Sequence, residues 1–300
     1  MLFSFVRYLA NQSTKFKELI RIKMQSISNI LKDILQWNDI NIVLITIEMI
    51  ISLCNDSQIR EYFANNPYNI LKDLLLTIRT LLQHKPLMWE KYIEMLLTLV
   101  TTLSLSEESH DFIIQAGLSY YFDKEIKILV ERYPRVLTKF INFFTIMTRS
   151  SKYLTELLQA DNFVLYLFTS LKPFCETIDN SIRILTRLFE SNIITLKIKV
   201  NKISIENTFE DIKGILRDAY DNKKKERYAN TCTLLYRFLK KYSKYIVEVK
   251  ELLPLLIKSG KEDTGIIKKN VCTLLAGIAI DEGNKEIIKS LHGLDLIKDF

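Results

Sequence analysis

The sequence predicts an all-α protein built as a solenoid, and three observations lead to that prediction. The hexapeptide Asn-Thr-Cys-Thr-Leu-Leu at residues 230–235 returns at residues 270–275, with only its second position changed. Apolar residues follow the helical spacing i, i+3, i+4 and i+7 through most of the 300 residues. The chain holds only 7 glycines and 5 prolines, so few positions break a helix. A fixed period near 40 residues is typical of stacked helical repeats.

The hexapeptide fixes the phase of the repeats if it lies in the most buried helix of each one. On that basis, each repeat ends at an apolar residue, and the six endings are Leu53, Leu103, Met147, Leu188, Phe238 and Ile278. Their spacings are 50, 44, 41, 50 and 40 residues, which gives about six repeats. After several endings the pattern predicts a polar break, a short helix and a turn.

Glycine marks two of the turns that follow the short helices, at Gly117 and Gly293. A helix commonly ends on a left-handed residue, a conformation that glycine adopts without steric cost. Asp161 and Asn162 take the same place in a third copy, and Asn tolerates this conformation next best. We therefore expect left-handed backbone at all three turns.

This unit resembles the armadillo repeat, in which a short helix, a glycine turn and two longer helices recur. The best match begins at Asn270, where Val-Cys-Thr-Leu-Leu-Ala-Gly-Ile-Ala at 271–279 is similar to the small-residue ending of that family, and it continues through Asn284 and Gly293 to residue 300. The resemblance implies a right-handed α-solenoid of about six armadillo-like three-helix repeats over residues 1–300. HEAT-like repeats, with two helices per unit, are the alternative fold.

Two segments depart from the regular pattern. Residues 191–207 read as a divergent or irregular insertion, because the β-branched stretch 196–203 alternates like a strand or an extended loop. Residues 283–300 read as an incomplete terminal repeat. After its turn at Gly293, residues Leu294, Leu296, Ile297 and Phe300 remain apolar. We therefore expect this end either to dock on something or to continue into a longer array.

The sequence shows none of the residue constellations that common enzymes use. The three histidines, His84, His110 and His292, lie in different predicted repeats and have no second ligand at metal-binding spacing. No glycine-rich phosphate loop or nucleophile elbow is present. Cys232 and Cys272 occupy the same hexapeptide position, and we expect them to be small core residues. The prediction is a non-catalytic protein without metal, cofactor or small-molecule substrate.

Cysteine usage and hydropathy favour a cytoplasmic location. The four cysteines form no dense disulfide framework, which is typical of a reducing compartment. The N-terminus lacks the features of a signal peptide, and the strongest apolar run, 42–54, is shorter than the roughly 20 residues of a membrane span. We expect no membrane insertion. The armadillo resemblance adds the cytoskeleton or cilium as an alternative location.

Positive charge is concentrated in one part of the chain. Residues 194–270 hold 18 Lys/Arg against 10 Asp/Glu, whereas the remaining residues are about neutral and the net charge is +7. This excess favours an acidic partner. Armadillo proteins that grip extended peptides carry an asparagine ladder near the end of each buried helix. Here the ladder positions hold Ser52, Thr102, Ile146, Arg187, Arg237 and Gly277.

The missing asparagines and the two arginines argue against a grip on a basic localisation peptide. Arginine can instead form two parallel hydrogen bonds to a carboxylate. The candidate partner-binding residues are Arg187, Arg237, Lys240, Lys241, Lys223, Lys224, Lys225 and Arg227. The structural alternative is that Lys240 and Lys241 favour a helix C-terminus and that residues 223–227 form a solvated loop.

Two functions follow from these patterns. The first is a scaffold or adaptor that binds an acidic surface or segment of another protein, through a concave groove or the open C-terminal end, in a cytoplasmic or cytoskeletal assembly, with a ciliary one included. The alternative is a nucleic-acid-binding solenoid that uses the basic region 194–270. Its candidate stacking residues are Tyr228, Tyr236, Tyr242 and Tyr245.

Overall fold

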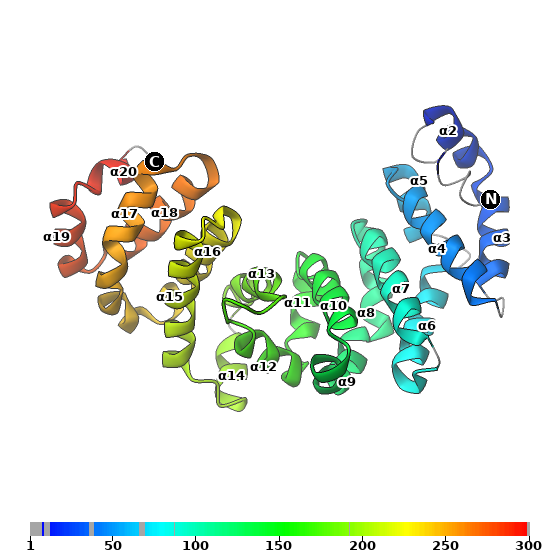
Figure 1. Ribbon diagram of the computed structural model, residues 1–300, viewed down its shortest axis with the longest axis horizontal. Helices are drawn as coiled ribbons and strands as arrows, with labels where there is room; N and C mark the ends of the chain where they lie inside the picture. Colours follow the sequence, from blue (N-terminus) through cyan, green and yellow to red (C-terminus); the bar gives the residue numbers. More distant parts are fainter. Residues whose placement is uncertain are drawn as a thin grey trace. The chain divides into compact units, whose positions relative to one another are not determined.

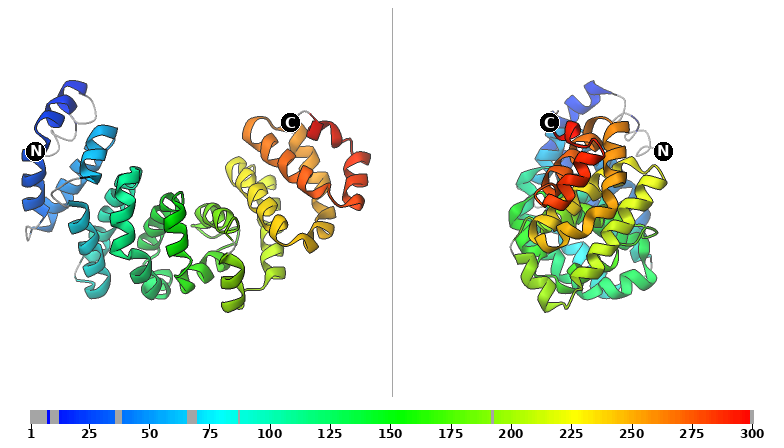
Figure 2. Two further views of the ribbon diagram at one scale, coloured as in Figure 1. Left: turned by 180° about the vertical axis from the view of Figure 1, so that it is seen from behind. Right: turned by 90° about the vertical axis from the view of Figure 1, so that its left-hand side faces the viewer.

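The computed structural model describes residue 8 and residues 13–35, 39–65, 70–86, 88–191 and 193–298. Over these residues the chain forms nineteen α-helices, two 3-10 helices and no strand. The chain divides into two compact units, Met1–Phe163 and Val164–Phe300, and α12 (Asp161–Thr169) contains the boundary. Within each unit the helices follow one another in chain order (Figures 1 and 2).

In the first unit, three long helices form a row in which α4 packs on α7 and α7 packs on α10. The helix before each of them packs against it, since α3 contacts α4, α6 contacts α7 and α9 contacts α10. The bounds are α2 (Thr14–Ile22), α3 (Met24–Leu35), α4 (Ile40–Leu53), α5 (Ser57–Ala64), α6 (Ile70–His84), α7 (Trp89–Leu103), η1 (Glu107–Ser109), α8 (His110–Ala116), α9 (Leu118–Arg132), α10 (Pro134–Met147) and α11 (Ser151–Leu157).

The second unit repeats this arrangement, because α13 packs on α16 and α16 packs on α18, with α15 and α17 beside them. A ten-residue 3-10 helix, η2, connects α16 to α17. The bounds are α13 (Ile178–Leu188), α14 (Ile193–Val200), α15 (Ile205–Asp221), α16 (Lys225–Lys241), η2 (Ser243–Leu252), α17 (Leu253–Glu262), α18 (Gly265–Ile278), α19 (Glu282–Ser290) and α20 (Leu294–Lys298).

The predicted repeat endings coincide with the helices of these rows. Five of the six are the last residues of α4, α7, α10, α13 and α18, and Phe238 lies in the last turn of α16. All six side chains are fully buried. The two hexapeptides lie in α16 and α18, which pack on each other. The prediction that the hexapeptide marks the buried helix is therefore confirmed.

Many polar contacts between helices join residues about 40 positions apart in the sequence. Six of the ion pairs between described residues join positions 38 to 41 apart, and these are Lys32–Asp73, Lys85–Glu125, Asp111–Lys152, Lys172–Asp211, Lys213–Glu251 and Lys225–Asp263. The hexapeptide follows the same rule, since Asn270 Nδ2 donates to Ala229 O at 2.9 Å, the residue before the other copy. Buried Asn284 donates to Ile246 O at 2.7 Å, 38 residues away.

The expected left-handed turns are only partly correct. Gly117 has a φ of 61°, as predicted. At the second turn the left-handed residue is His292, with a φ of 56°, because the bond from Gly293 N to Ile288 O places the turn one residue earlier. Gly293 is required for space instead, since a Cβ there would lie 2.9 Å from Ile257 Cδ1.

The third predicted turn is not left-handed. Neither Asp161 nor Asn162 has a positive φ, and Asp161 is the first residue of α12. The chain leaves α11 through two tight hydrogen bonds, from Gln159 N to Glu156 O and from Ala160 N to Leu157 O. These bonds satisfy the end of α11 without a left-handed residue.

The expectation of an extended stretch at 196–203 is wrong for residues up to Val200, which belong to α14. Ile194 and Ile198 are both buried, so an i, i+4 pair holds this helix against the unit although its neighbours alternate in polarity. At the C-terminal end, Leu296 is also buried, and Phe300 lies outside the described residues. A divergent insertion at 191–207 and one continuous array over the chain stay predictions.

Two alanine substitutions should separate backbone strain from helix propensity. Gly117→Ala should lower the free energy of unfolding by about 1 kcal/mol, because its positive φ is costly for any residue with a Cβ. Gly214→Ala, in the exposed interior of α15, should raise it by about 0.5–1 kcal/mol. A Cβ has no neighbour within 4 Å at either site, so packing does not confuse the comparison. Urea unfolding followed by circular dichroism measures both, and changes of the same sign would contradict this account.

Candidate partner-binding surface

The six predicted ladder positions occupy equivalent places in the structure. Each is half-buried and lies in the last turns of its helix, in α4, α7, α10, α13, α16 and α18. The hydroxyls among them bond within their own helices, from Ser52 to Glu48 O at 3.0 Å and from Thr102 to Thr98 O at 2.9 Å. Gly277 makes room for Tyr236, because a Cβ there would lie 2.8 Å from the ring.

The two arginines of the ladder lie on α13 and α16, which pack on each other. Arg187 is half-buried in the last turn of α13. Arg237 Nη2 lies 2.7 Å from Glu190 Oε1, and its side chain is 34% exposed. A carboxylate from a partner would therefore compete with Glu190 for this guanidinium.

The two lysines at the end of α16 have different environments. Lys241 is half-buried, donates to Ser191 O and has a pKa lowered by burial. It fastens the end of α16 to the segment that precedes α14. Lys240 is exposed and forms no ion pair with the described residues. Of the two, only Lys240 presents an uncompensated charge to solvent.

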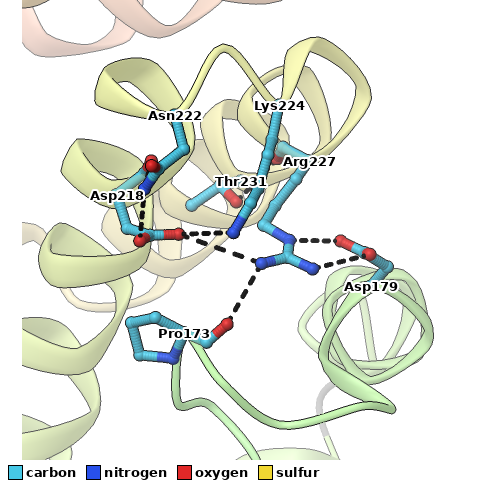
Figure 3. A network of polar contacts seen from close by, with 7 residues as sticks. All are labelled: Pro173, Asp179, Asp218, Asn222, Lys224, Arg227 and Thr231. Atoms are coloured by element: carbon cyan, nitrogen blue, oxygen red, sulfur yellow. Dashed lines mark hydrogen bonds and ion pairs between the residues drawn. The ribbon is translucent and has the colours of Figure 1, made fainter.

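Arg227 is the centre of a polar network that joins three parts of the second unit (Figure 3). It donates from Nε to Asp179 Oδ1 at 2.7 Å, from Nη2 to Asp179 Oδ2 at 2.9 Å and from Nη1 to Pro173 O at 3.2 Å. These bonds tie α16 to α13 and to the loop before it, and the Asp179 bonds raise the pKa of Arg227. The side chain is only 14% exposed. Its guanidinium nitrogens are therefore already hydrogen-bonded to Asp179 and Pro173, so they are not available to a partner's carboxylate.

Lys224 takes part in the same network through Asp218. Its Nζ lies 3.2 Å from Asp218 Oδ2, while Asn222 Nδ2 donates to Asp218 Oδ1 at 2.8 Å (Figure 3). These contacts connect the end of α15 to the start of α16. Lys224 and Arg227 therefore hold the α15–α16 turn in place, a structural role that the sequence-based reading of a basic loop did not foresee.

Lys223 and Lys225 line an open cleft of about 510 Å³ in the second unit. Lys225 pairs with Asp263 at 2.9 Å, whereas Lys223 is exposed and forms no ion pair with the described residues. The charged residues along the cleft are Lys223, Lys225, Lys258, Asp221, Glu262 and Asp263. Positive and negative charges balance, so the cleft offers no net attraction for an acidic ligand.

Two of the four tyrosines predicted to stack on nucleic-acid bases are buried. Tyr228 is 3% exposed, and its hydroxyl hydrogen-bonds with Ser259 Oγ at 2.7 Å. Tyr245 is 5% exposed, and its ring centroid lies 4.9 Å from that of Phe209. Tyr236 and Tyr242 are half-buried. Because bases need exposed ring faces to stack on, Tyr228 and Tyr245 are core residues rather than binding residues.

The histidines and cysteines occupy separate places. A ring nitrogen of His110, Nε2, lies 2.9 Å from Ser104 O, and His84 and His292 are exposed. Among the described residues, no group of three or more His, Cys, Asp or Glu side chains is placed to hold a metal ion. Cys232 and Cys272 are buried and lie outside any disulfide bond, as expected of small core residues. None of the described helices combines the length and the hydropathy that a membrane crossing requires.

The ion pairs of Lys213 and Lys225 could have been predicted from the sequence. Carboxylates lie 38 residues after Lys213 and Lys225, the separation of neighbouring repeats. A search for opposite charges one repeat apart therefore finds them. The bonds of Arg227 to Asp179 span 48 residues and fall outside this rule. Sequence reasoning also missed Leu196 and Val200, two exposed apolar residues of α14.

Substitutions at Arg227 and Lys225 should distinguish a structural cation from a surface one. Arg227→Ala should destabilise the second unit by about 2 kcal/mol, because several charge-assisted hydrogen bonds are lost while Asp179 regains some water. Lys225→Ala should cost less than about 1 kcal/mol, since its side chain is 73% exposed. Urea unfolding of the full chain measures both. Equal effects would remove the distinction.

The thiols should react in an order set by burial. Cys54, Cys232 and Cys272 are buried, and burial raises the pKa of Cys54 to about 12 and also raises that of Cys232. We expect an aromatic disulfide reagent at mildly alkaline pH to label only half-buried Cys175 before unfolding. Cys175→Ser should remove this fast phase. Fast labelling of Cys232 or Cys272 in the folded protein would show that the hexapeptide thiols are accessible.

No protein-family model matches the chain, and the search of curated proteins finds no significant relative. The resemblance to armadillo repeats therefore rests on the internal repeats of the chain itself.

Proposed function

We propose that this chain is a non-catalytic protein–protein interaction scaffold, built as a right-handed α-solenoid of about six armadillo-like repeats. The observation that carries the proposal is the recurrence of interhelical ion pairs and side-chain hydrogen bonds at separations of 38 to 41 residues. Such contacts are expected when each repeat packs on the next in the same way. Stacked repeats expose a large surface for their length, and that surface is their usual means of binding.

The ladder positions support binding of an extended partner segment. One half-buried residue near the end of each central helix recurs from repeat to repeat, as in armadillo proteins that hold extended peptides. In the second unit this position is arginine in two successive central helices, at Arg187 and Arg237. Lys240 adds an uncompensated charge at the end of α16. The partner is accordingly an acidic protein segment, in a cytoplasmic or cytoskeletal assembly, with a cilium as the alternative setting.

Among the candidate cations, the structure favours Lys240 and Arg237 for this role. Arg227 and Lys224 already hold the α15–α16 turn, and Lys241 holds Ser191. Arg237 can exchange one carboxylate for another, since its present partner Glu190 has a side chain that is 48% exposed. The partner would thus displace Glu190 rather than enter an empty pocket.

Three single substitutions test this proposal with a tagged full chain in native extract. Lys240→Glu should reduce the retention of bound proteins several-fold, because it places a negative charge where an acidic segment binds. Lys269→Glu, at an exposed lysine of α18 outside the candidate surface, is the matched control and should have no effect. Glu190→Gln should increase retention, because it leaves Arg237 without a competing carboxylate.

Quantitative mass spectrometry of the captured proteins measures these changes, with circular dichroism as the folding control. Identical capture by the wild type, Lys240→Glu and Glu190→Gln would refute binding at this surface. Capture that a nuclease abolishes would favour the nucleic-acid alternative instead.

A further inference from the structure

Helix α14 presents an apolar pair to solvent. Leu196 and Val200 are 61% and 59% exposed, and their i, i+4 spacing puts them on one face of the helix. Ile194 and Ile198 are buried and fix α14 to the rest of the unit. The exposed pair is therefore displayed by a helix that has its own anchors.

The segment that carries this pair has charge of one sign. Residues 191–205 contain three lysines, Lys197, Lys199 and Lys202, and no Asp or Glu. Lys199 and Lys202 are exposed and form no ion pair with the described residues. This differs from Lys172, Lys213 and Lys225 of the same unit, each of which has a carboxylate partner. Lys199 and Lys202 have no such carboxylate partner among the described residues.

Lys202 occupies a position where glycine is the usual residue. Its φ is 51°, and the hydrogen bond from Ile203 N to Ile198 O closes the end of α14 in the manner of a Schellman motif. A lysine in this left-handed conformation has a steric cost that glycine avoids. The chain therefore keeps a positive charge beside the apolar pair at a site where backbone geometry alone favours glycine.

The end of α16 contacts the segment that precedes α14. Lys241 donates to Ser191 O, and the rings of Phe189 and Tyr242 lie 6.3 Å apart, so the end of α16 lies against the segment that begins α14. Exposed Lys240 and Lys244 stand two residues to either side of Tyr242.

The carboxylates nearest in sequence to α14 do not neutralise these lysines. Glu190 pairs with Arg237 at 2.7 Å. Glu206 lies in the first turn of α15, where a negative charge is already stabilised by the helix N-terminus. The four residues Leu196, Lys199, Val200 and Lys202 define what we call the α14 surface.

We propose that the α14 surface binds an amphipathic acidic segment of a partner protein. Two apolar side chains of that segment cover Leu196 and Val200, and flanking Asp or Glu side chains pair with the lysines. The inference rests on the proposed scaffold function and names the chemistry of its partner. Charge complementarity selects an acidic segment, while the apolar pair selects spaced apolar residues rather than a purely acidic tail.

Other occupants fit the α14 surface less well. A nucleic acid would find lysines, but Leu196 and Val200 offer no aromatic face on which bases could stack. An anionic membrane would use the lysines, yet the surface supplies only two exposed apolar side chains for insertion, fewer than the continuous apolar face of an interfacial helix. These occupants are separate outcomes of the experiment.

The experiment measures binding of fluorescent synthetic peptides to the full chain by anisotropy. One peptide places leucines at helical spacing among glutamates, and the second has the same composition in scrambled order. The third is polyglutamate. We expect the first to bind at least about tenfold more tightly than the other two, because only it can match apolar and charged groups together.

Substitutions locate the site. Leu196→Ser combined with Val200→Ser, and separately Lys199→Glu, should each weaken binding of the first peptide by at least about tenfold. The matched controls are Ile266→Ser, at a 66% exposed isoleucine of α18, and Lys269→Glu at an exposed lysine of the same helix. Both controls should leave affinity within about twofold of the wild type.

Three results would overturn the proposal. The first is equal affinity for the patterned, scrambled and polyglutamate peptides, and the second is equal loss in the α14 and control variants. The third is binding of phosphatidylserine vesicles or single-stranded RNA, but of none of the peptides. If protein capture from extract still depends on Lys240 while the patterned peptide does not bind, the scaffold function survives and only this inference fails.

Discussion

The fold depends on one constraint, which is that no repeat can bury the apolar face of its central helix without its neighbours. An apolar residue at or near the end of each of α4, α7, α10, α13, α16 and α18 is fully buried, and within each unit these helices pack on one another. Burying one such Leu, Ile, Met or Phe side chain is worth about 1.5–3 kcal/mol. In each unit, other helices pack beside the row that these helices form there.

The polar contacts between repeats add specificity to that apolar packing. Asn270 reaches the carbonyl of Ala229, and Asn284 reaches that of Ile246, at nearly the same separation as the ion pairs. A slip of one residue between two helices would leave these donors without acceptors, which is costly where the side chain is buried. The exposed ion pairs that follow the same spacing contribute little to stability, but they favour the same alignment.

The sequence was sufficient to predict the helical class and the buried helices, because one repeated hexapeptide gave the phase. It was insufficient at α14, where Leu-Lys-Ile-Lys-Val satisfies both the strand period and, through Ile194 and Ile198, the helix period. It also misplaced the left-handed residue of the last turn by one position. A glycine that is required because a Cβ would clash, as at Gly293, looks the same in a sequence as a glycine that is required for a positive φ. At the candidate site, the charges were visible, but their partners were not. The sequence places Arg227 in a basic loop, whereas in the structure its guanidinium donates to Asp179 and Pro173.

The separation of 38 to 41 residues between contacting side chains also has a consequence for how the chain folds during synthesis. A helix meets these partners as soon as roughly one further repeat has been made, so no contact of this kind waits for the distant end of the chain. Folding can then advance in the direction of translation. At any time, only the most recently completed repeat exposes an apolar face that waits for its neighbour. At each moment the growing end alone needs protection from aggregation, rather than the whole unfinished protein.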